Sequence, residues 1–430
     1  MFIFGPWGEW SDCDVTCDLG RKTRSRECPG NDCASIDGKG LTDLEVCDSM
    51  VLCPFVDSGK LLIVGGLLEG SSAQKVSSEV VDVRSGQTCT SPEFRTDYRE
   101  GTFGALLWNK YAVVMGGDAV KEEIHVFRSD GTITDVKVEG EGKSRKYAAA
   151  VTLADKMSMY VVGGYYSGEG TITKSTEVIT LSEDGNSATG KSGPDIPKTL
   201  VNHCFTTFID ADGNRNFFLF GGSQTVSPAA SNQATGFSTS GWVLKESDFD
   251  PDVSTSWDNA VSTPTAGLPS DASDGSDGMP FITCTTFKNG DGKEQVMIIG
   301  DQYWYKEDAP NALDKTKALI YQPDTNTFVD GPTLEIDTQQ LVIVNWYKAS
   351  LYASTQIANE IVLTGGQGML SSAEYSQTDI EYSKYKFKLK CDEGVTNTAD
   401  CKFEIMDQKL DYGRRQHITF HVPDPWVTCT

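Results

Sequence analysis

A short apolar run that ends in glycine recurs six times along the chain from residue 60 onward. The six runs span residues 61–66, 111–117, 160–164, 217–222, 296–300 and 361–366. Consecutive apolar residues of this kind are typical of a strand that is buried on both faces. The closing glycine has no Cβ, so the strand can end closely against its neighbour. The pattern therefore predicts a repeated β-structure.

Further strand-like runs flank most of the glycine-terminated runs. One run precedes each of them except the first, at residues 103–108, 147–153, 205–210, 282–287 and 341–346. Other runs follow them, at residues 79–83, 123–127 and 177–181. The dipeptides Asp212-Gly213 and Asp291-Gly292 are typical of tight hairpin turns. A unit of about 50 residues with four strands is typical of a β-propeller blade, so we expect six blades.

These repeats resemble kelch repeats over residues 56–430. The resemblance implies an all-β fold in which a six-bladed kelch-like β-propeller follows the N-terminal segment. Two features depart from the kelch pattern. Asp301 follows Gly300 where kelch repeats have a second glycine, and the Trp that often follows the third strand is mostly missing.

The first glycine-terminated run has no strand-like run before it, and the C-terminus offers one. Residues 414–424 alternate apolar and polar positions and resemble the opening strand of a repeat that nothing completes. We expect this segment to pair with residues 61–64 and close the ring. Closure would remove two exposed sheet edges at once.

The N-terminal segment has a different pattern, with six cysteines between residues 13 and 53. So short a segment cannot bury a sufficient apolar core, and disulfides are the usual substitute in an oxidising compartment. Zinc is a weak alternative because residues 1–55 contain neither a Cys-x-x-Cys pair nor a histidine. The spacing also predicts that Trp7 and Trp10 stack against cationic side chains of a neighbouring strand, namely those of Lys22, Arg24 and Arg26.

Residues 5–54 resemble a thrombospondin type 1 repeat in tryptophan spacing, cysteine pattern and alternating basic residues. The resemblance implies a three-stranded ribbon with the bridges Cys13–Cys47, Cys17–Cys53 and Cys28–Cys33. It also implies C-mannose on Trp7 and Trp10 and O-fucose on Thr16, although these residues could serve in stacking and packing alone. The basic strand contacts sulphated glycans in some family members, but here four acidic residues dilute its charge.

Six more cysteines lie in the repeats, and six cysteines allow fifteen pairings. Cys391 and Cys401 flank a turn-rich stretch, which favours a local bridge. Cys204 and Cys284 open corresponding strands of adjacent repeats, which favours a bridge between them. The remaining pair, Cys89 with Cys429, would attach the C-terminal strand to the first repeat.

The net charge of −24 excludes some partners. Such a chain repels nucleic acid and anionic membrane surfaces at long range. Its longest apolar runs, residues 61–64 and 217–220, are far too short to cross a bilayer, so no membrane insertion is expected. A secretory signal is expected to have been removed or to lie outside this sequence.

Candidate catalytic chemistry is sparse. The histidines at positions 125, 203, 417 and 421 favour structural roles, and they form no tyrosine–histidine constellation like that of galactose oxidase, an enzyme with kelch repeats. Residues 210–214 and 269–278 are rich in aspartate, but a hairpin turn and a solvated insertion explain them better than calcium sites. The aromatic residues Tyr303, Trp304 and Tyr305 could anchor a ligand, or they could pack between repeats.

Together these observations predict a secreted, extracellular recognition or adhesion protein of the matrix or cell surface. We expect it to bind a protein or glycan ligand, to need no metal or other cofactor and to catalyse nothing. The alternative is a secreted propeller enzyme, similar to galactose oxidase, with a metal in the central channel.

Overall fold

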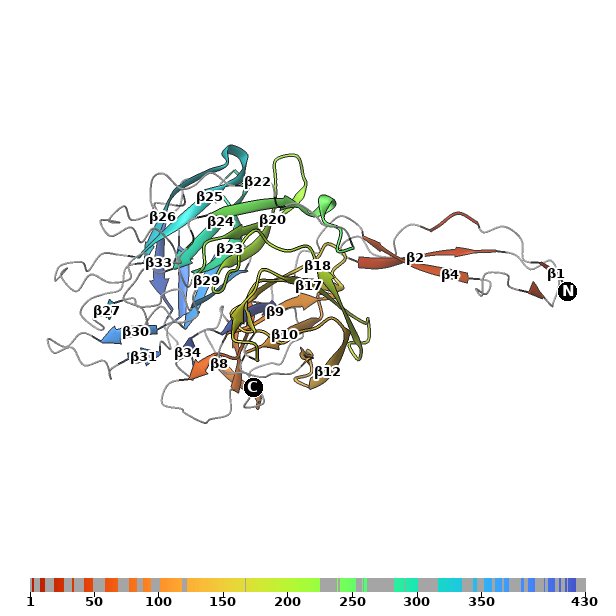
Figure 1. Cartoon of the computed structure of the whole chain (residues 1–430), viewed down its shortest axis with the longest axis horizontal. Helices are drawn as coiled ribbons and strands as arrows, with labels where there is room; N and C mark the ends of the chain where they lie inside the picture. Colours follow the sequence, from red (N-terminus) through yellow and green to blue (C-terminus); the bar gives the residue numbers. More distant parts are fainter. Residues whose placement is uncertain are drawn as a thin grey trace. The chain divides into compact units, whose positions relative to one another are not determined.

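The computed structural model divides the chain into two compact units, Met1–Ser58 and Gly59–Thr430. The boundary falls a few residues after the expected end of the N-terminal module, and both units consist of strands and connecting loops (Figure 1). The structure describes residues 2–3, 8–11, 19–26, 33–34, 42–48, 59–68, 77–82, 88–93, 101–117, 122–166, 168–224, 238, 240–252, 257, 259–260, 282–289, 291–300, 316–334, 343–345, 352–357, 360–365, 367–370, 380–382, 386–390, 398, 401–406, 410, 414–415 and 417–422.

The described part of the first unit is a narrow β-ribbon. Its strands are β1 (Phe2–Ile3), β2 (Leu19–Ser25), β3 (Cys33–Ala34) and β4 (Thr42–Asp48). Strands β2 and β4 pair antiparallel along their whole length, and β1 pairs parallel with β3. Residues 8–11 also run along β2, because the Gly8 and Ser11 amides donate to the carbonyls of Ser25 and Thr23 at 2.8 and 2.7 Å.

Within the described residues, pairing sorts most strands of the second unit into six antiparallel groups of four. Group 1 is β35 (Ile418–Val422), β5 (Lys60–Val64), β7 (Ser77–Asp82) and β8 (Thr88–Glu93); group 2 is β9 (Thr102–Leu107), β10 (Tyr111–Gly116), β11 (Glu123–Phe127) and β12 (Ile133–Gly140); group 3 is β13 (Ala149–Thr152), β14 (Ser158–Val162), β17 (Thr176–Leu181) and β18 (Ala188–Gly193). Group 4 is β19 (Cys204–Ile209), β20 (Arg215–Phe220), β21 (Gly241–Lys245) and β22 (Asn259–Ala260); group 5 is β23 (Ile282–Lys288), β24 (Glu294–Gly300), β25 (Thr316–Gln322) and β26 (Thr327–Leu334); group 6 is β28 (Tyr352–Ile357), β29 (Glu360–Gly365), β32 (Lys386–Lys390) and β33 (Lys402–Ile405).

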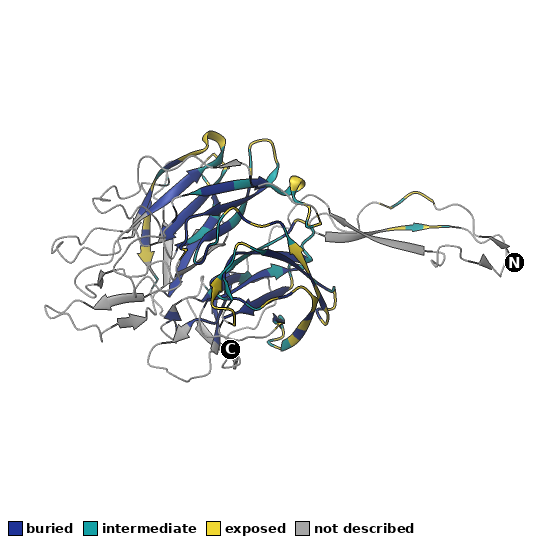
Figure 2. Ribbon diagram, in the orientation of Figure 1, coloured by how far each residue is buried: buried dark blue, intermediate teal, exposed yellow. Residues whose placement is uncertain are grey.

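Each glycine-terminated run forms the second strand of its group, and Figure 2 shows how deeply these strands are buried. Side chains alternate between the two faces of a strand. In β5, Leu62 and Val64 pack against group 2, whereas Leu61 and Ile63 pack against group 6. The unbroken apolar run is required because each second strand supplies two cores at once.

The groups follow one another in a closed cycle. The first strand of each group contacts the first strand of the next, in the order β35, β9, β13, β19, β23, β28 and back to β35. A separate apolar core fills each of the six spaces between neighbouring groups. The fold of this unit is therefore all-β and β-propeller-like.

The C-terminal strand closes this cycle. Strand β35 pairs antiparallel with β5 from Ile418↔Val64 to Val422↔Lys60, which is the pairing expected from the sequence. It is the first strand of group 1, although it lies at the other end of the chain. Immediately before it, β34 (Arg414–Arg415) pairs with β6 (Leu67–Leu68).

In the part of the second unit that the structure describes, two parallel contacts join outer strands of neighbouring groups. Strand β12 pairs with β18, and β26 pairs with β33, so groups 2 and 3 form one eight-stranded sheet and groups 5 and 6 form another. The first contact depends on a glycine, because a Cβ at Gly190 would lie 1.4 Å from the Glu141 carbonyl oxygen. Any side chain there would separate the two strands.

One sequence expectation is wrong. Residues 341–346 were expected to form the first strand of the last repeat, but β28 takes that place and pairs with β29. Only two residues separate β28 from β29, so this hairpin closes at low entropic cost. Part of the expected segment instead forms β27 (Ile343–Asn345), in a small sheet with β30 (Gln367–Leu370) and β31 (Ile380–Tyr382).

The remaining described elements are short. Strands β15 (Tyr165–Tyr166) and β16 (Thr171–Ile172) form a hairpin, and the two 3-10 turns are η2 (Glu246–Asp248) and η3 (Pro323–Thr325). In the part of the chain that the structure describes, no helix has the length and hydropathy needed to cross a membrane.

Candidate ligand-binding surfaces and the seams between groups

The described part of the first unit contains one of the expected stacking contacts. The Arg24 guanidinium lies over the Trp10 ring, 4.4 Å from its centroid. Strand β2 presents Arg24, and residues 8–11 hold the ring beside it through backbone hydrogen bonds. The other expected participants, the side chains of Trp7 and Lys22, and the modification site Thr16 lie outside the described residues, whereas Arg26 directly follows β2.

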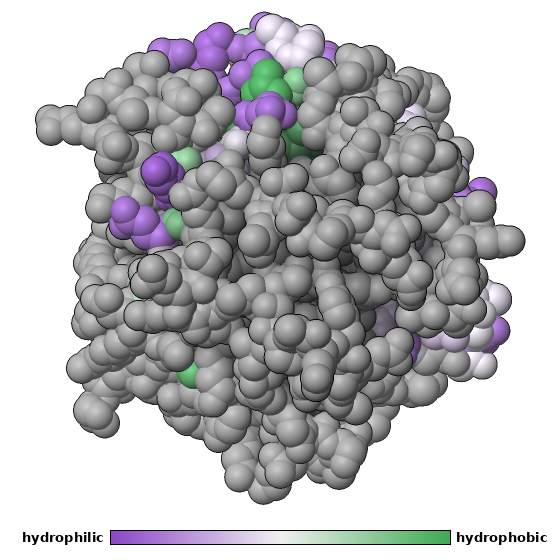
Figure 3. Space-filling model, turned by 90° about the vertical axis from the view of Figure 1, so that its left-hand side faces the viewer, coloured by the Kyte–Doolittle hydropathy of each residue, from purple (hydrophilic) through white to green (hydrophobic). Residues whose placement is uncertain are grey.

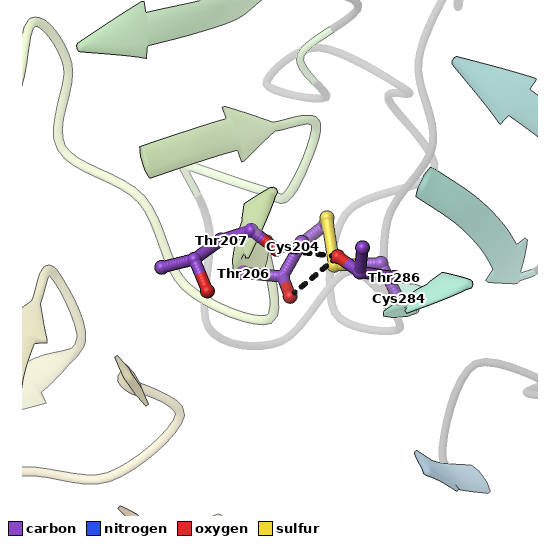
Figure 4. The surroundings of a disulfide bond; sticks show 5 residues. All are labelled: Cys204, Thr206, Thr207, Cys284 and Thr286. Carbon is purple, nitrogen blue, oxygen red and sulfur yellow. Dashed lines mark hydrogen bonds between the residues drawn. A yellow bond between two sulfur atoms is a disulfide. The ribbon is translucent and has the colours of Figure 1, made fainter. Parts of the chain in front are cut away.

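A disulfide joins Cys204 of β19 to Cys284 of β23, the two cysteines that the sequence analysis pairs across adjacent repeats (Figure 4). Their Cα atoms are 5.4 Å apart. Beside it, the Thr286 hydroxyl donates to the Thr207 carbonyl oxygen at 2.5 Å and lies 3.3 Å from the Thr206 hydroxyl. We call the interface between two neighbouring groups a seam. At the seam between groups 4 and 5, a disulfide and hydrogen bonds thus join the first strands.

Replacement of both Cys204 and Cys284 by serine is expected to lower the free energy of unfolding by about 2–4 kcal/mol. The bridge closes a loop across 80 residues of sequence, and its loss frees that loop in the unfolded chain. Urea unfolding followed by tryptophan fluorescence measures the change. Thr283→Ser in the same strand is the control, and a double variant as stable as wild type would contradict the expectation.

The other cysteine predictions lie mainly outside the described residues. Cys401 is buried and disulfide-bonded, and its expected partner Cys391 is not among the described residues. Cys429 and the side chain of Cys89 also lie outside the described residues. In the first unit the side chains of all the expected bridge residues also lie outside the description, namely Cys13, Cys17, Cys28, Cys33, Cys47 and Cys53.

Two of the described histidines, His203 and His417, pack on a glycine of the neighbouring group. His203 enters β19 and packs on Gly163 of group 3, where a Cβ would lie 2.9 Å from its Cε1 atom; burial lowers the pKa of His203 to about 3. His417 enters β35 and packs in the same way on Gly365 of group 6. Burial, followed by the nearby Arg414 charge, lowers the pKa of His417 well below its usual value. Both imidazoles are therefore neutral near pH 7.

His125 has a separate role within group 2. Its Nδ1 atom lies 2.7 Å from the Asp135 carboxylate on the next strand. The aspartate-rich residues 210–214 form a hairpin turn, in which the Asp210 carboxylate accepts from the Asp212 and Asn214 amides. Within the described ranges, no three His, Cys, Asp or Glu side chains gather in a way that could hold a metal ion.

Two buried ion pairs were missed by sequence reasoning. Arg145, just before β13, pairs with Glu177 of β17, and their side chains are 0% and 4% exposed. Arg145 also donates to the carbonyls of Gly163 and Ser175 at 2.8 and 2.9 Å. The guanidinium thereby satisfies the backbone where the second and third strands of group 3 separate.

Group 1 contains an equivalent buried ion pair, made by residues near the two ends of the second unit. Arg414 pairs with Glu79 of β7, both fully buried, and donates to the Gly65 carbonyl at 3.2 Å. The signal in the sequence is a glutamate that opens the third-strand runs at positions 79, 123 and 177. The partner arginine stands shortly before a first strand in both groups, Arg145 before β13 and Arg414 before β35.

The expected aromatic anchors Tyr303, Trp304 and Tyr305 lie outside the described residues. The connection that holds them joins β24 to β25. On the face that Figure 3 shows, the coloured residues are mainly hydrophilic, with small separate hydrophobic areas. Among the described residues, Ile209 is the only large hydrophobic side chain classed as exposed.

Comparison with known proteins found no curated protein that matches the chain. A family model does match part of it. Residues 5–53, which include the Trp10–Arg24 stack and the β2–β4 ribbon, match the thrombospondin type 1 domain.

Proposed function

We propose that this chain is a non-enzymatic extracellular recognition protein. The observation that carries the proposal is the match of residues 5–53 to the thrombospondin type 1 domain, because such domains are extracellular and bind proteins or glycans. Disulfide bonding of Cys204, Cys284 and Cys401 supports an oxidising compartment. Adhesion or matrix assembly would suit a chain that carries two binding units.

The second unit is proposed to be a six-bladed kelch-like β-propeller. Six antiparallel groups of four strands, six separate cores and a closed cycle of first strands support this proposal. The glycine at the end of each second strand supports the kelch type. A rigid ring of this kind holds its connecting loops in fixed positions, where they can form a binding surface.

The absence of catalysis is part of the proposal. Three of the four histidines, at positions 125, 203 and 417, are buried within group 2 or against a neighbouring group, which favours a structural role over copper ligation. The rival reading remains a propeller enzyme with a metal in its channel. Glycans on Trp7, Trp10 and Thr16 and ligand contacts of Tyr303, Trp304 and Tyr305 also stay predictions.

One set of measurements tests the proposed function. The full chain, secreted from a host that has C-mannosyl and O-fucosyl transferases, is assayed on a glycan array and against extracellular matrix proteins, and its metal content is measured. Saturable binding to a glycan or a matrix protein, with less than one equivalent of metal, is the expected result. Stoichiometric copper or iron together with oxidase turnover would favour the enzyme instead.

A further inference from the structure

The closing strand β35 is attached to its group in a different way from the other first strands. In groups 2 to 6, a link of two to five residues joins the first strand to the second. Strand β35 has no such link to β5, because the two strands lie at opposite ends of the second unit. Its ladder to β5 and its side-chain contacts hold it in place. Detachment of β35 can therefore open the ring without straining a turn.

A buried titratable side chain, His417, lies where β35 meets group 6. A Cβ at Gly365 of β29 would lie 2.5 Å from the His417 Cε1 atom, so the imidazole fills the space that this glycine leaves. The His417 Nε2 atom lies 2.8 Å from the Thr364 hydroxyl, which is itself 3.0 Å from the Thr419 hydroxyl. His417 is 7% exposed, so almost no water reaches it.

The hydrogen bonds around His417 suit a neutral imidazole. A neutral ring carries one N–H group, and the Thr364 hydroxyl can either accept from Nε2 or donate to it. Among the described residues, the Nδ1 atom has no hydrogen-bond partner. A protonated ring carries two N–H groups, so one of them would be buried without an acceptor.

The charges that face His417 also oppose its protonation. Arg414 of β34 lies three residues before it, and after burial its guanidinium charge is the next cause that lowers the pKa of His417. The Glu79 carboxylate of β7 already pairs with this guanidinium. The contacts from β29 and β35, Thr364 and Thr419, are uncharged hydroxyls. Protonation would thus place a second cation beside Arg414 in a buried site, which is unfavourable.

We propose that His417 makes the closing strand a pH-sensitive switch, in which mild acid favours detachment of β35 and opens the ring at group 1. Histidine suits this role because its charge changes near neutral pH. The switch does not depend on which ligand the chain recognises. A ring that opens at group 1 would, however, no longer hold the connecting loops of groups 1 and 6 in fixed positions.

The direction of the effect follows from the proton affinity of the two forms. When β35 detaches, His417 enters water and its pKa returns to the ordinary value of 6.5. The pKa is well below this value in the closed ring, so the open form binds the proton more tightly. The closed form is therefore fully stable above pH 6.5 and loses stability as the pH falls below it. Between pH 7.5 and 5.5, the opening equilibrium is expected to shift about tenfold.

His203 provides a comparison within the same ring. It stands just before β19 and packs on Gly163 of group 3, and burial lowers its pKa to about 3, although the Val162 backbone favours the proton. Strand β19 cannot leave as β35 can. The Cys204–Cys284 disulfide joins it to β23, and a five-residue turn joins it to β20. Acid is therefore expected to open the ring at β35 first.

Hydrogen exchange followed by mass spectrometry tests the switch on the full chain. Protection factors are measured at pH 7.5 and 5.5, with each rate divided by that of an unstructured peptide at the same pH. The amides of residues 60–64 and 418–422 are expected to lose about tenfold in protection at pH 5.5, and those of β24 in group 5 to keep theirs. Ordinary carboxylates remain mostly ionised at both pH values.

Variants assign the loss of protection to one imidazole. His417→Gln keeps a neutral polar side chain that can contact the Thr364 hydroxyl, but it cannot take up a proton in this pH range. It is expected to reduce the tenfold loss to less than about twofold. His203→Gln is the matched control, because it removes a buried imidazole from another seam and should leave the response of β35 intact. Thermal melting at pH 7.5 verifies that both variants are folded.

Three results would overturn the switch. The first is equal protection of β35 at the two pH values, and the second is an equal loss in β35 and β24. The third is a full tenfold loss that persists in folded His417→Gln. If this variant does not fold, the wild-type comparison of β35 with β24 decides, since a loss confined to residues 60–64 and 418–422 supports the switch.

Discussion

Removal of residues 414–430 is expected to prevent the second unit from folding. The deletion takes away all of β35, with its ladder to β5 and the buried side chains of Phe420 and Val422. It also leaves Glu79 buried without Arg414. Each ladder bond contributes about 0.5–1.5 kcal/mol and each buried apolar side chain about 1.5–3 kcal/mol. Their sum rivals the whole stability of a typical domain, about 5–15 kcal/mol.

The measurement is secretion yield, followed by thermal melting of any secreted protein. A permuted chain is the control. Val422 pairs with Lys60, so residues 414–422 can be moved to a position just before Gly59, with a short turn between the two strands. This chain is expected to fold although its C-terminus has been removed. A simple truncation that is secreted and melts like the full chain would show that β35 does not close the ring.

Arg414→Met is expected to destabilise the protein by about 3–5 kcal/mol. The change leaves the Glu79 carboxylate buried with its charge uncompensated, and such a loss costs far more than the net contribution of the intact pair. The double variant Arg414→Met, Glu79→Leu is expected to recover most of this loss, because neither side chain then carries a charge into the interior. The midpoint of urea unfolding, with tryptophan fluorescence as the probe, gives both values.

Group 3 supplies the matched comparison. Arg145→Met is expected to destabilise by a similar amount, since Glu177 is buried in the same way. Lys174→Ala breaks an ion pair with Asp195 whose side chains are both half exposed, and it should leave the midpoint unchanged. Equal shifts of the unfolding midpoint in Arg414→Met and Lys174→Ala would show that a buried ion pair matters no more to stability than an exposed one.

Periodicity made the second strands and the closing strand predictable. Each second strand borders two cores, so its apolar run is continuous and visible without knowledge of its partners. The bridge from Cys204 to Cys284 was also predictable from the repeats, because the two residues occupy equivalent places in adjacent repeats. The first strand of group 6 was not, because β28 mixes polar and apolar residues and its position depends on a short hairpin.

The buried ion pairs escaped the sequence for a different reason. Arg414 and Glu79 are 335 residues apart, so no local pattern pairs them. A charged residue is normally exposed, so composition alone places both on the surface.

The parallel contacts of β12 with β18 and of β26 with β33 make the joints of the ring unequal. Groups that share a continuous sheet are expected to open together, with groups 2 and 3 as one cooperative block and groups 5 and 6 as another. Among the described residues, groups 1 and 4 have no such parallel contact, so they stand between these blocks. The disulfide clamps group 4 on one side, whereas group 1 is assembled from the two ends of the second unit. Local unfolding, and with it proteolytic attack or the exchange of a strand between molecules, is therefore expected to begin at group 1.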